Sequence, residues 1–410
     1  MPPSAGSLRI AFVVLHTSPL DEPGTKDAGG MNVVVRAQAA ELARAGHRVE
    51  LITRRSDPGL PDAVELAEGL TVRHLDAGPA RLLSKGEHES LMEPFGRALG
   101  EHLRVDPVDV LHAEHWFSGV AALPVARELG VPLVQSFHSI AAEPGSPLTE
   151  GERPESPGRI SGERRLAAEA DLLVAVSLAE RDTMLERLGA DPERVRVVPL
   201  GVDTALFRPC EPGECAERRA WIEHGGSPEV LVAGRLHPLK GFDLAVAAVA
   251  AIPPGRRPAL RVIGAPPPDG DDYVRELHTA IAEAGMLSTV AFDGALRRAE
   301  LAERLRRAAI VLMPSHSETF GLVALEASAS GVPVVARAAG GLREAVIDGE
   351  TGVLIDGDDP EVWAAAIAHL LGDEELASRM GAAARRHALN RDWAASAAQL
   401  LEAYRELLAG

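Results

Sequence analysis

Short hydrophobic runs alternate with amphipathic segments along the first half of the chain. The first run covers residues 8–15 and is apolar almost throughout, which is typical of a strand buried on both faces of a parallel sheet. Similar runs follow at residues 48–54, 70–75, 108–112, 131–137, 172–176 and 195–199. The pattern predicts helices between most of them, at residues 31–45, 89–103, 116–128, 159–168 and 178–188. Strand–helix alternation of this kind predicts a doubly wound α/β domain.

The same pattern starts again after residue 199. Residues 200–215 are rich in turn-forming residues, and we interpret them as a boundary between two domains. A second series of strands is predicted at residues 229–233, 260–264, 289–292, 310–313, 332–336 and 352–355, with helices at 242–251, 271–284 and 298–308. Three helices end the chain, the last over residues 393–408. Ligands of such sheets bind beyond the carboxyl ends of the strands, so two facing domains would form one deep cleft.

Composition supports two globular domains and narrows the choice of partners. A chain of 410 residues is too long for one core, and its 46% apolar and 25% charged residues are ordinary values. The net charge of −18 disfavours nucleic acid and anionic membranes as partners. The first residues lack a basic signal-peptide region, and no apolar stretch is long enough to span a bilayer, so we expect a cytoplasmic protein. In a reducing cytosol Cys210 and Cys215 are expected to be free thiols in a linker.

The most informative stretch covers residues 313–336. It is predicted to contain a strand end, a polar loop, a helix from near residue 320 to residue 331, and a new strand from residue 332. Glu318 lies in the loop and Glu326 two turns into the helix, about 12 Å apart, which is close to the reach of a nucleotide-sugar from ribose to hexose. The amides of Phe320, Gly321 and Leu322 would open the helix and suit a diphosphate. The alternative interpretation is structural. One glutamate would be an acid near the start of a helix, where the helix dipole favours it, and the other would be exposed to solvent.

Other polar residues follow predicted strands. Gly29 and Gly30 open a helix and would let its amides approach a phosphate, although the spacing is not that of a dinucleotide fingerprint, so NAD chemistry is disfavoured. Arg235 and Lys240 lie just past a strand. There the planar guanidinium of Arg235 and the ammonium group of Lys240 could both bind one diphosphate. A solvated loop is the alternative interpretation of that pair.

Histidines and isolated basic residues complete the candidates. His112 and His115 lie at the end of one strand, and His138 at the end of another, from which its imidazole should project into the cleft. A structural hydrogen-bonding role is the alternative for each histidine. Lys85 and Arg159 are isolated basic residues near acidic loops, where a plain surface role is the alternative.

Together these residues carry a family resemblance. Arg235 and Lys240, followed by Glu318-x7-Glu326 and the segment GVPVVA, resemble the retaining nucleotide-sugar glycosyltransferases of family 4. Those enzymes have the GT-B fold, which has two Rossmann-like doubly wound domains that face each other across a cleft and a C-terminal helix that crosses back. The resemblance implies an acceptor-binding domain over residues 1–200, a nucleotide-sugar-binding domain over residues 201–390, and a crossing helix over residues 391–410. The segments HTSPLDEPGTKDAGGMNVVV, SKGE, HAEHWFSGV and GRLHPLKGFD further resemble the glycosyltransferases of mycothiol biosynthesis, which move N-acetylglucosamine from UDP onto inositol 3-phosphate.

The resemblance implies a role for each candidate residue. The catalytic residues would be His138, Arg235, Lys240 and Glu318. The donor would be bound by Gly29, Gly30, Arg235, Lys240, Glu318, Thr319, Phe320, Gly321, Leu322 and Glu326, with Glu326 on the ribose and Glu318 on the transferred sugar. The acceptor would be bound by His16, Asn32, Lys85, His115, Ser139 and Arg159. A UDP-sugar is the expected co-substrate, with a GDP-sugar as the alternative, and neither a metal nor another cofactor is expected.

The acceptor site departs from the family pattern at two positions. His115 and Ser139 stand where the inositol-phosphate enzymes have a tyrosine and a threonine. The pocket could therefore serve another acceptor, such as an aminocyclitol or a small thiol. An epimerase or phosphorylase on this architecture, and a sensor that binds sugar nucleotides without turnover, are alternatives from other classes. The expected partners are the small-molecule donor and acceptor. The sequence does not decide whether the protein forms a homodimer.

Overall fold

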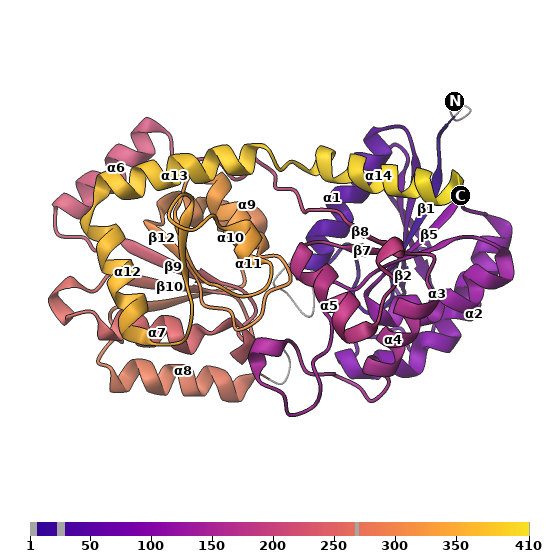
Figure 1. Cartoon of the computed structure of the whole chain (residues 1–410), viewed down its shortest axis with the longest axis horizontal. Helices are drawn as coiled ribbons and strands as arrows, with labels where there is room; N and C mark the ends of the chain where they lie inside the picture. The colour runs from indigo at the N-terminus through magenta and orange to yellow at the C-terminus, as the bar shows by residue number, and fades with distance from the viewer. Residues whose placement is uncertain (1–5, 23–28, 267–269, 410) are drawn as a thin grey trace.

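Two sheets flanked by helices form the two halves of the molecule (Figure 1). The structure is a computed structural model that describes residues 6–22, 29–266 and 270–409. The first sheet has the strand order β3-β4-β2-β1-β5-β6-β7-β8, in which β3 is antiparallel to β4 and the other neighbours are parallel. Its strands are β1 (Arg9–Val14), β2 (Arg48–Arg54), β3 (Ala63–Ala67), β4 (Leu70–Leu75), β5 (Val110–Glu114), β6 (Leu133–Ser136), β7 (Leu172–Ala175) and β8 (Val195–Val197). Its helices are α1 (Gly30–Arg44), α2 (Met92–Val105), α3 (His115–Leu129), α4 (Arg159–Glu169) and α5 (Leu178–Leu188), with a 3-10 turn η1 (Lys85–Leu91) before α2.

The second sheet is parallel throughout, in the order β11-β10-β9-β12-β13-β14. Its strands are β9 (Glu229–Ala233), β10 (Ala259–Ile263), β11 (Val290–Gly294), β12 (Ile310–Met313), β13 (Val334–Arg337) and β14 (Gly352–Ile355). The helices of this half are α6 (Pro212–Glu223), α7 (Phe242–Ala251), α8 (Asp271–Glu283), α9 (Arg298–Arg307), α10 (Leu322–Ala329), α11 (Leu342–Ala345), α12 (Pro360–Gly372) and α13 (Glu374–Leu389). The predicted α/β fold with two doubly wound sheets is confirmed.

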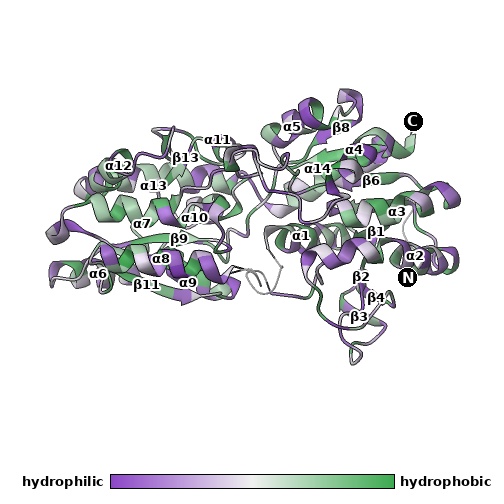
Figure 2. Cartoon of the chain, turned by 90° about the horizontal axis from the view of Figure 1, so that it is seen from below, coloured by the Kyte–Doolittle hydropathy of each residue, from purple (hydrophilic) through white to green (hydrophobic). Residues whose placement is uncertain are grey.

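Hydrophobic side chains fill the space on both faces of each sheet. In Figure 2 strand β9 is strongly hydrophobic, whereas the outer helix α9 is mostly hydrophilic, as expected for a parallel sheet covered by amphipathic helices. One cluster includes Val33 and Val176 from the first half together with Phe320 and Leu325 from the second. The two halves are therefore joined by hydrophobic packing as well as by the chain.

Helix α14 (Trp393–Ala409) packs on the first half, and its first residue belongs to the hydrophobic cluster that the two halves share. Trp393 belongs to the hydrophobic cluster that contains α10, whereas Leu400 and Tyr404 pack with the first sheet. Figure 1 shows α14 lying along the first half beside α1 after the chain leaves α13. The C-terminal helix therefore crosses back, as the resemblance implied, while the boundaries at residues 200 and 390 stay predictions.

Strand β3, helix α6, the one-turn helix α11 and the start of α10 differ from the prediction. Strand β3 was not predicted, because residues 63–67 are mostly exposed and show no buried run. Helix α6 lies where we expected only linker, and it begins with proline at its first position and a capping box formed by Glu211 and Glu214. The helix predicted from residue 320 begins two residues later, at Leu322, because Gly321 has a φ of +95° and cannot be helical.

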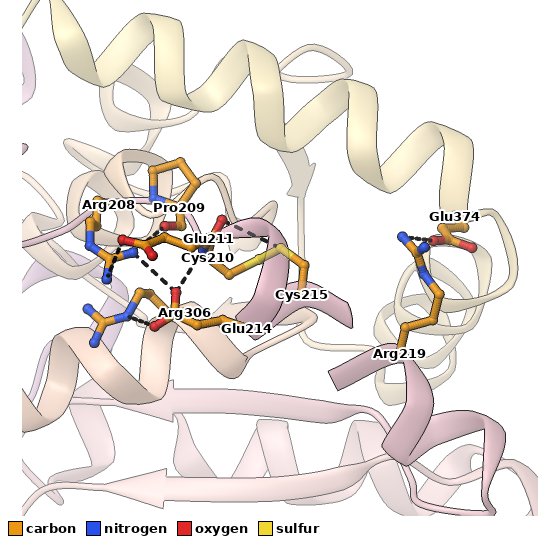
Figure 3. The surroundings of a disulfide bond; sticks show 9 residues. All are labelled: Arg208, Pro209, Cys210, Glu211, Glu214, Cys215, Arg219, Arg306 and Glu374. Atoms are coloured by element: carbon orange, nitrogen blue, oxygen red, sulfur yellow. Dashed lines mark hydrogen bonds and ion pairs between the residues drawn. A yellow bond between two sulfur atoms is a disulfide. The ribbon is translucent and has the colours of Figure 1, made fainter. Parts of the chain in front are cut away.

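The prediction of two free thiols is wrong in this structure, in which Cys210 and Cys215 form a disulfide (Figure 3). The start of α6 places their Cα atoms 5.6 Å apart, within the range that a disulfide requires. Ion pairs surround the bridge, since Glu214 contacts Arg208 at 3.1 Å and Arg306 of α9 at 3.5 Å (Figure 3). The disulfide therefore closes a short loop at the start of α6, and the Glu214–Arg306 pair holds this segment beside α9 of the second half.

Candidate active site

A cavity of about 430 Å³ lies between the two halves, at the carboxyl ends of several strands of both sheets. It is lined by residues that follow β1, β6 and β7 in the first half and β9, β10 and β12 in the second. All of the site residues predicted from the sequence line this cavity except Arg159. Gly29 and Gly30 line the same cavity, and residues 23–28, which precede them, lie outside the described residues.

Two predicted catalytic residues are in direct contact. Lys240, in the turn Pro238–Lys240 after β9, donates a hydrogen bond of 2.6 Å from Nζ to Oε2 of Glu318. Arg235 lies on the same loop, and its guanidinium donates to Oε1 of Glu152 at 3.0 Å. The two cations and Glu318 thus line one cavity, whereas their contact with a diphosphate stays a prediction.

The loop before α10 approaches the cavity closely. Gly321 caps the helix in the left-handed region, and a Cβ at this position would lie 2.7 Å from Cδ2 of Leu342. Glycine is therefore required both by the backbone conformation and by packing. The first amides of α10 have no carbonyl four residues earlier in the helix, so this end of the cavity has the character of an anion site.

The second glutamate of the predicted pair is buried, contrary to the exposed alternative. Glu326 is 1% exposed, and its Oε1 accepts a hydrogen bond of 2.7 Å from Arg298 at the start of α9. Burial raises the pKa of Glu326, and Arg298 opposes that shift. The Arg298 guanidinium also lies 4.9 Å from the ring centroid of Phe207. Arg298 was not singled out in the sequence, because it lies in the arginine-rich start of an otherwise ordinary surface helix.

His138 is held from both halves of the molecule. It has a φ of +59°, which is uncommon for a residue other than glycine, and its Nε2 hydrogen-bonds the buried carboxylate of Glu114. Its carbonyl oxygen accepts a hydrogen bond of 2.9 Å from Thr319. Burial alone would lower the pKa of His138, but the Glu114 carboxylate raises it overall. Glu114 was missed because it carries no motif of its own.

Glu180 of α5 is a second buried acid that sequence reasoning missed, and unlike Glu114 it lines the cavity. One carboxylate oxygen accepts a hydrogen bond of 2.8 Å from the amide of Val176, while the other has no partner within the described part of the chain. Burial raises the pKa of Glu180 to about 7. Near neutral pH this carboxyl group therefore carries a proton in a substantial fraction of molecules.

The predicted acceptor residues surround a carboxylate that was not predicted. Oε2 of Glu152 accepts a hydrogen bond of 3.2 Å from Ser139 and lies 3.6 Å from Nζ of Lys85 and 3.5 Å from a guanidinium nitrogen of Arg159. Arg159 does not reach the cavity, because it is fully buried and also paired with Glu163 at 2.8 Å. Burial alone would raise the pKa of Glu152, but the nearby cations hold it well below its usual range.

Two histidines line the same end of the cavity. The ring centroids of His16 and His115 are 4.3 Å apart, and neither ring nitrogen of His115 has a hydrogen-bond partner among the described residues. Burial lowers the pKa of both side chains, with nearby Lys85 acting in the same direction. His115 also has a positive φ, of 69°. A buried side chain without partners on a backbone of uncommon conformation is typical of a ligand-binding wall.

The start of α1 forms the remaining wall. A Cβ at Gly29 or Gly30 would meet nothing within 4 Å, and neither has a positive φ, so packing within the described chain does not require glycine there. The side chain of Asn32 bonds Thr17 at 2.9 Å and the carbonyl of Ser18 at 2.7 Å. Asn32 therefore holds the loop after β1 in place, and its contact with an acceptor stays a prediction.

One group of possible metal ligands occurs among the described residues, away from the cavity. It consists of Glu50, His102 and Asp106. Glu50 is already bonded to Arg73 at 3.0 Å and to His102 at 2.6 Å, and Asp106 is paired with Arg48. These pairs account for the cluster as a structural ion network.

The fold and the cavity define a GT-B glycosyltransferase, and comparisons with known proteins agree. Residues 28–206 match the family described as Glycosyltransferase Family 4, and residues 215–387 match Glycosyl transferases group 1. The chain therefore belongs to the family 4 glycosyltransferases and is an enzyme of that class. Helices of the length and hydrophobicity needed to cross a membrane are absent from the described residues.

Individual relatives match almost end to end. D-inositol 3-phosphate glycosyltransferase from Kineococcus radiotolerans is 42% identical, over 98% of this chain and 96% of the relative. The protein of the same name from Thermobispora bispora is 41% identical, over 98% and 95%. Among solved structures, sucrose-phosphate synthase from Thermosynechococcus elongatus has a TM-score of 0.88 and 30% identity, covering 98% of this chain and 99% of its own. Anabaena HepE in complex with UDP-glucose has a TM-score of 0.76 at 21% identity, with 97% and 100% covered, and shows the fold alone.

Proposed function

We propose that this enzyme transfers N-acetylglucosamine from UDP-N-acetylglucosamine to D-inositol 3-phosphate with retention of anomeric configuration and without a metal, as in mycothiol biosynthesis. The name shared by the relatives supports the acceptor. The resemblance of the Arg235, Lys240 and Glu318-x7-Glu326 pattern supports the donor class and retention, and a protein of the same fold is described in complex with UDP-glucose. The observation that carries the proposal is the single cavity in which the Lys240–Glu318 pair, Arg235 and the start of α10 face Lys85, Ser139 and His115.

The donor end would act on the leaving group. When the bond to the anomeric carbon breaks, negative charge develops on the departing diphosphate, and Arg235, Lys240 and the first amides of α10 would stabilise it. Glu318, held by Lys240, would bind hydroxyl groups of the transferred sugar, and Glu326, held by Arg298, would bind the ribose. Because these cations supply the positive charge, the proposal gives no role to a metal.

The acceptor hydroxyl would attack from the face that the diphosphate leaves, and the diphosphate oxygen would accept its proton. His138 would stabilise the sugar near the reacting carbon and would not act as a nucleophile. Its ring is fixed by Glu114 and its carbonyl by Thr319 of the other half, so closure of the two halves would set its position. Closure would also exclude water and limit hydrolysis of the donor.

A second acceptor class is supported by a specific observation. The cations at the acceptor end are already paired with Glu152, Glu155 and Glu163. An aminocyclitol or a small thiol would enter such a charge-balanced pocket without having to compete for those cations. For that class a GDP-sugar donor is included as an alternative.

The test is a transfer assay read by mass spectrometry in buffer with EDTA. The donors are UDP-N-acetylglucosamine and GDP-sugars, and the acceptors are inositol 3-phosphate, free inositol, an aminocyclitol and small thiols. We expect an N-acetylglucosaminyl product only with inositol 3-phosphate, and an α-linkage by NMR because the donor is α-linked. A β-linked product would overturn retention, activity that disappears in EDTA would overturn metal independence, and transfer only to another acceptor would overturn the acceptor assignment.

A further inference from the structure

Glu152 stands where an acceptor anion is expected. Its Oε2 lies within 3.6 Å of Lys85, Ser139 and Arg159, which are three of the residues that the resemblance assigns to the acceptor. Its other oxygen accepts from Arg235 at 3.0 Å. A single carboxylate therefore occupies the donors that would otherwise bind a phosphate group.

Glu152 also separates Arg159 from the cavity. Glu152 lines the cavity whereas Arg159, directly behind it, has no exposed surface. A ligand can reach the Arg159 guanidinium only if the Glu152 side chain moves aside. Residues 151–158, which carry Glu152, connect a short 3-10 turn to α4 and have no regular structure. Gly151, directly before Glu152, has a φ of +129°, a backbone conformation that glycine adopts readily and other residues rarely adopt.

We propose that Glu152 is a specificity-determining residue that competes with anions for the acceptor site, so that simple anions are rejected and only an anion carried by a matching polyol displaces it. This inference rests on the proposed function for the identity of the acceptor. A free phosphate ion would gain only the contacts that Glu152 gives up. A phosphorylated polyol adds its own hydroxyl contacts along the cavity wall, which offset the cost of moving the carboxylate.

The surrounding charges explain why the competition is effective. Glu152 remains ionised because three cations surround it, and a negative group placed beside it would meet direct repulsion. Arg159 keeps Glu155 and Glu163 as partners when Glu152 is removed, so the fold does not depend on Glu152. Replacing this acid should therefore strengthen anion binding, the opposite of what loss of an ordinary binding residue does.

The test uses inorganic phosphate as the probe, by calorimetric titration of the whole enzyme saturated with UDP so that the donor cations are occupied. For Glu152→Gln, which removes the charge, and Glu152→Ala, which also opens the space, we expect phosphate to bind at least roughly tenfold more tightly than to the wild type, a change of about 1.4 kcal/mol. The KM for inositol 3-phosphate should fall in parallel, whereas binding of unphosphorylated inositol should not change. Glu143→Gln, in the loop that precedes the 3-10 turn and in an exposed pair with Arg164, is the matched control and should bind phosphate as the wild type does.

Each outcome separates the inference from the proposed function. Phosphate binding that is unchanged or weaker in both Glu152 variants would overturn the inference, because the carboxylate would then be organising the cations. Tighter phosphate binding without transfer to inositol 3-phosphate would support the inference and overturn the proposed acceptor. Melting curves of both variants should match the wild type within a few degrees, and a collapsed fold would overturn the claim that Arg159 stays paired.

Discussion

At the scale of single residues, Arg235 is the cation on which the proposed chemistry depends most. Within the described residues it has no acidic partner in its own half and pairs across the cavity with Glu152, so a diphosphate would have to displace that one contact. Arg235→Ala should lower kcat/KM by roughly 10²–10³, the usual effect of removing one preorganised group that stabilises developing charge. The exposed Arg275→Ala variant is the control, and a melting curve checks the fold. Near-normal transfer by Arg235→Ala would remove the residue from the mechanism.

A second residue-scale prediction concerns the buried carboxyl group of Glu180, whose pKa is raised from 4.5 to about 7 by burial. A raised pKa means that the folded protein keeps a proton that the unfolded chain has already lost. The resulting stability is fully present below pH 4.5 and is lost as the pH rises through about 7, by up to about 3 kcal/mol. Glu180→Gln cannot titrate, so its Tm relative to the wild type should rise between pH 5 and pH 8. The exposed Glu283→Gln variant is the control, and parallel Tm curves would contradict the prediction.

Residue-scale reasoning from the sequence found most of the residues that line the cavity but not the acids that pair with them. Glu318, Lys240 and His138 could be located because they follow predicted strands, and parallel strands place their carboxyl ends at one edge. Glu152 and Glu114 could not, because an isolated acid in a loop or at a strand end carries no spacing signal. Their partners are distant in sequence, as the contact between Arg235 and Glu152 shows.

At the scale of elements, the short helix α11 of the second half contacts the start of α5 in the first half. The carboxylate of Glu344 in α11 accepts hydrogen bonds from the amides of Leu178 at 3.0 Å and Ala179 at 3.1 Å, at the start of α5. These amides have no carbonyl partner within their own helix, and the positive end of the helix dipole favours an acid there. Glu344 thus caps a helix that belongs to the other half, and the contact exists only when the halves are close.

Removal of this cap should loosen the closed arrangement. Glu344→Ala should destabilise the closed arrangement of the two halves by about 1–2 kcal/mol, as loss of a helix cap commonly does. It should also speed hydrogen exchange at the first turn of α5. Exchange in the first sheet should not change. The exposed Glu350→Ala variant controls for removal of charge from the same region. Unaltered exchange at α5 in Glu344→Ala would show that the halves are held together without this contact.

The elements themselves were predicted well where packing alone decides them. Buried parallel strands such as β9 and β12 have continuous apolar runs, and their bounds agree with those expected. Strand β3 was not predicted because it is mostly exposed and pairs only with β4 among the described strands, so its residues show no periodic hydrophobic pattern. Helix α6 was not predicted for a similar reason. It buries little hydrophobic surface, so it lacks an amphipathic pattern, and its capping box and disulfide stabilise it instead.

At the scale of the whole molecule, α14 decides whether the halves behave as one unit. Its first residue, Trp393, is packed in a cluster with α10, and its later residues pack on the first sheet. Tyr404 is fully buried there, and its hydroxyl group is 2.6 Å from Nδ1 of the buried His112. One helix therefore contributes to a core in each half, so unfolding of either half exposes part of the other.

This arrangement predicts that unfolding of the two halves is coupled through Tyr404. Tyr404→Ala would leave a cavity against the first sheet and would remove the partner of Nδ1 of His112, at a cost of about 3–5 kcal/mol borne by the first half alone. By calorimetry the wild type should unfold in one main transition, whereas the variant should show an earlier transition of the first half followed by the second. Glu406→Ala, which removes only an exposed pair with Arg196, should keep one transition. A single transition shifted as a whole in Tyr404→Ala would mean that the shared cluster around Phe320 couples the halves without the helix.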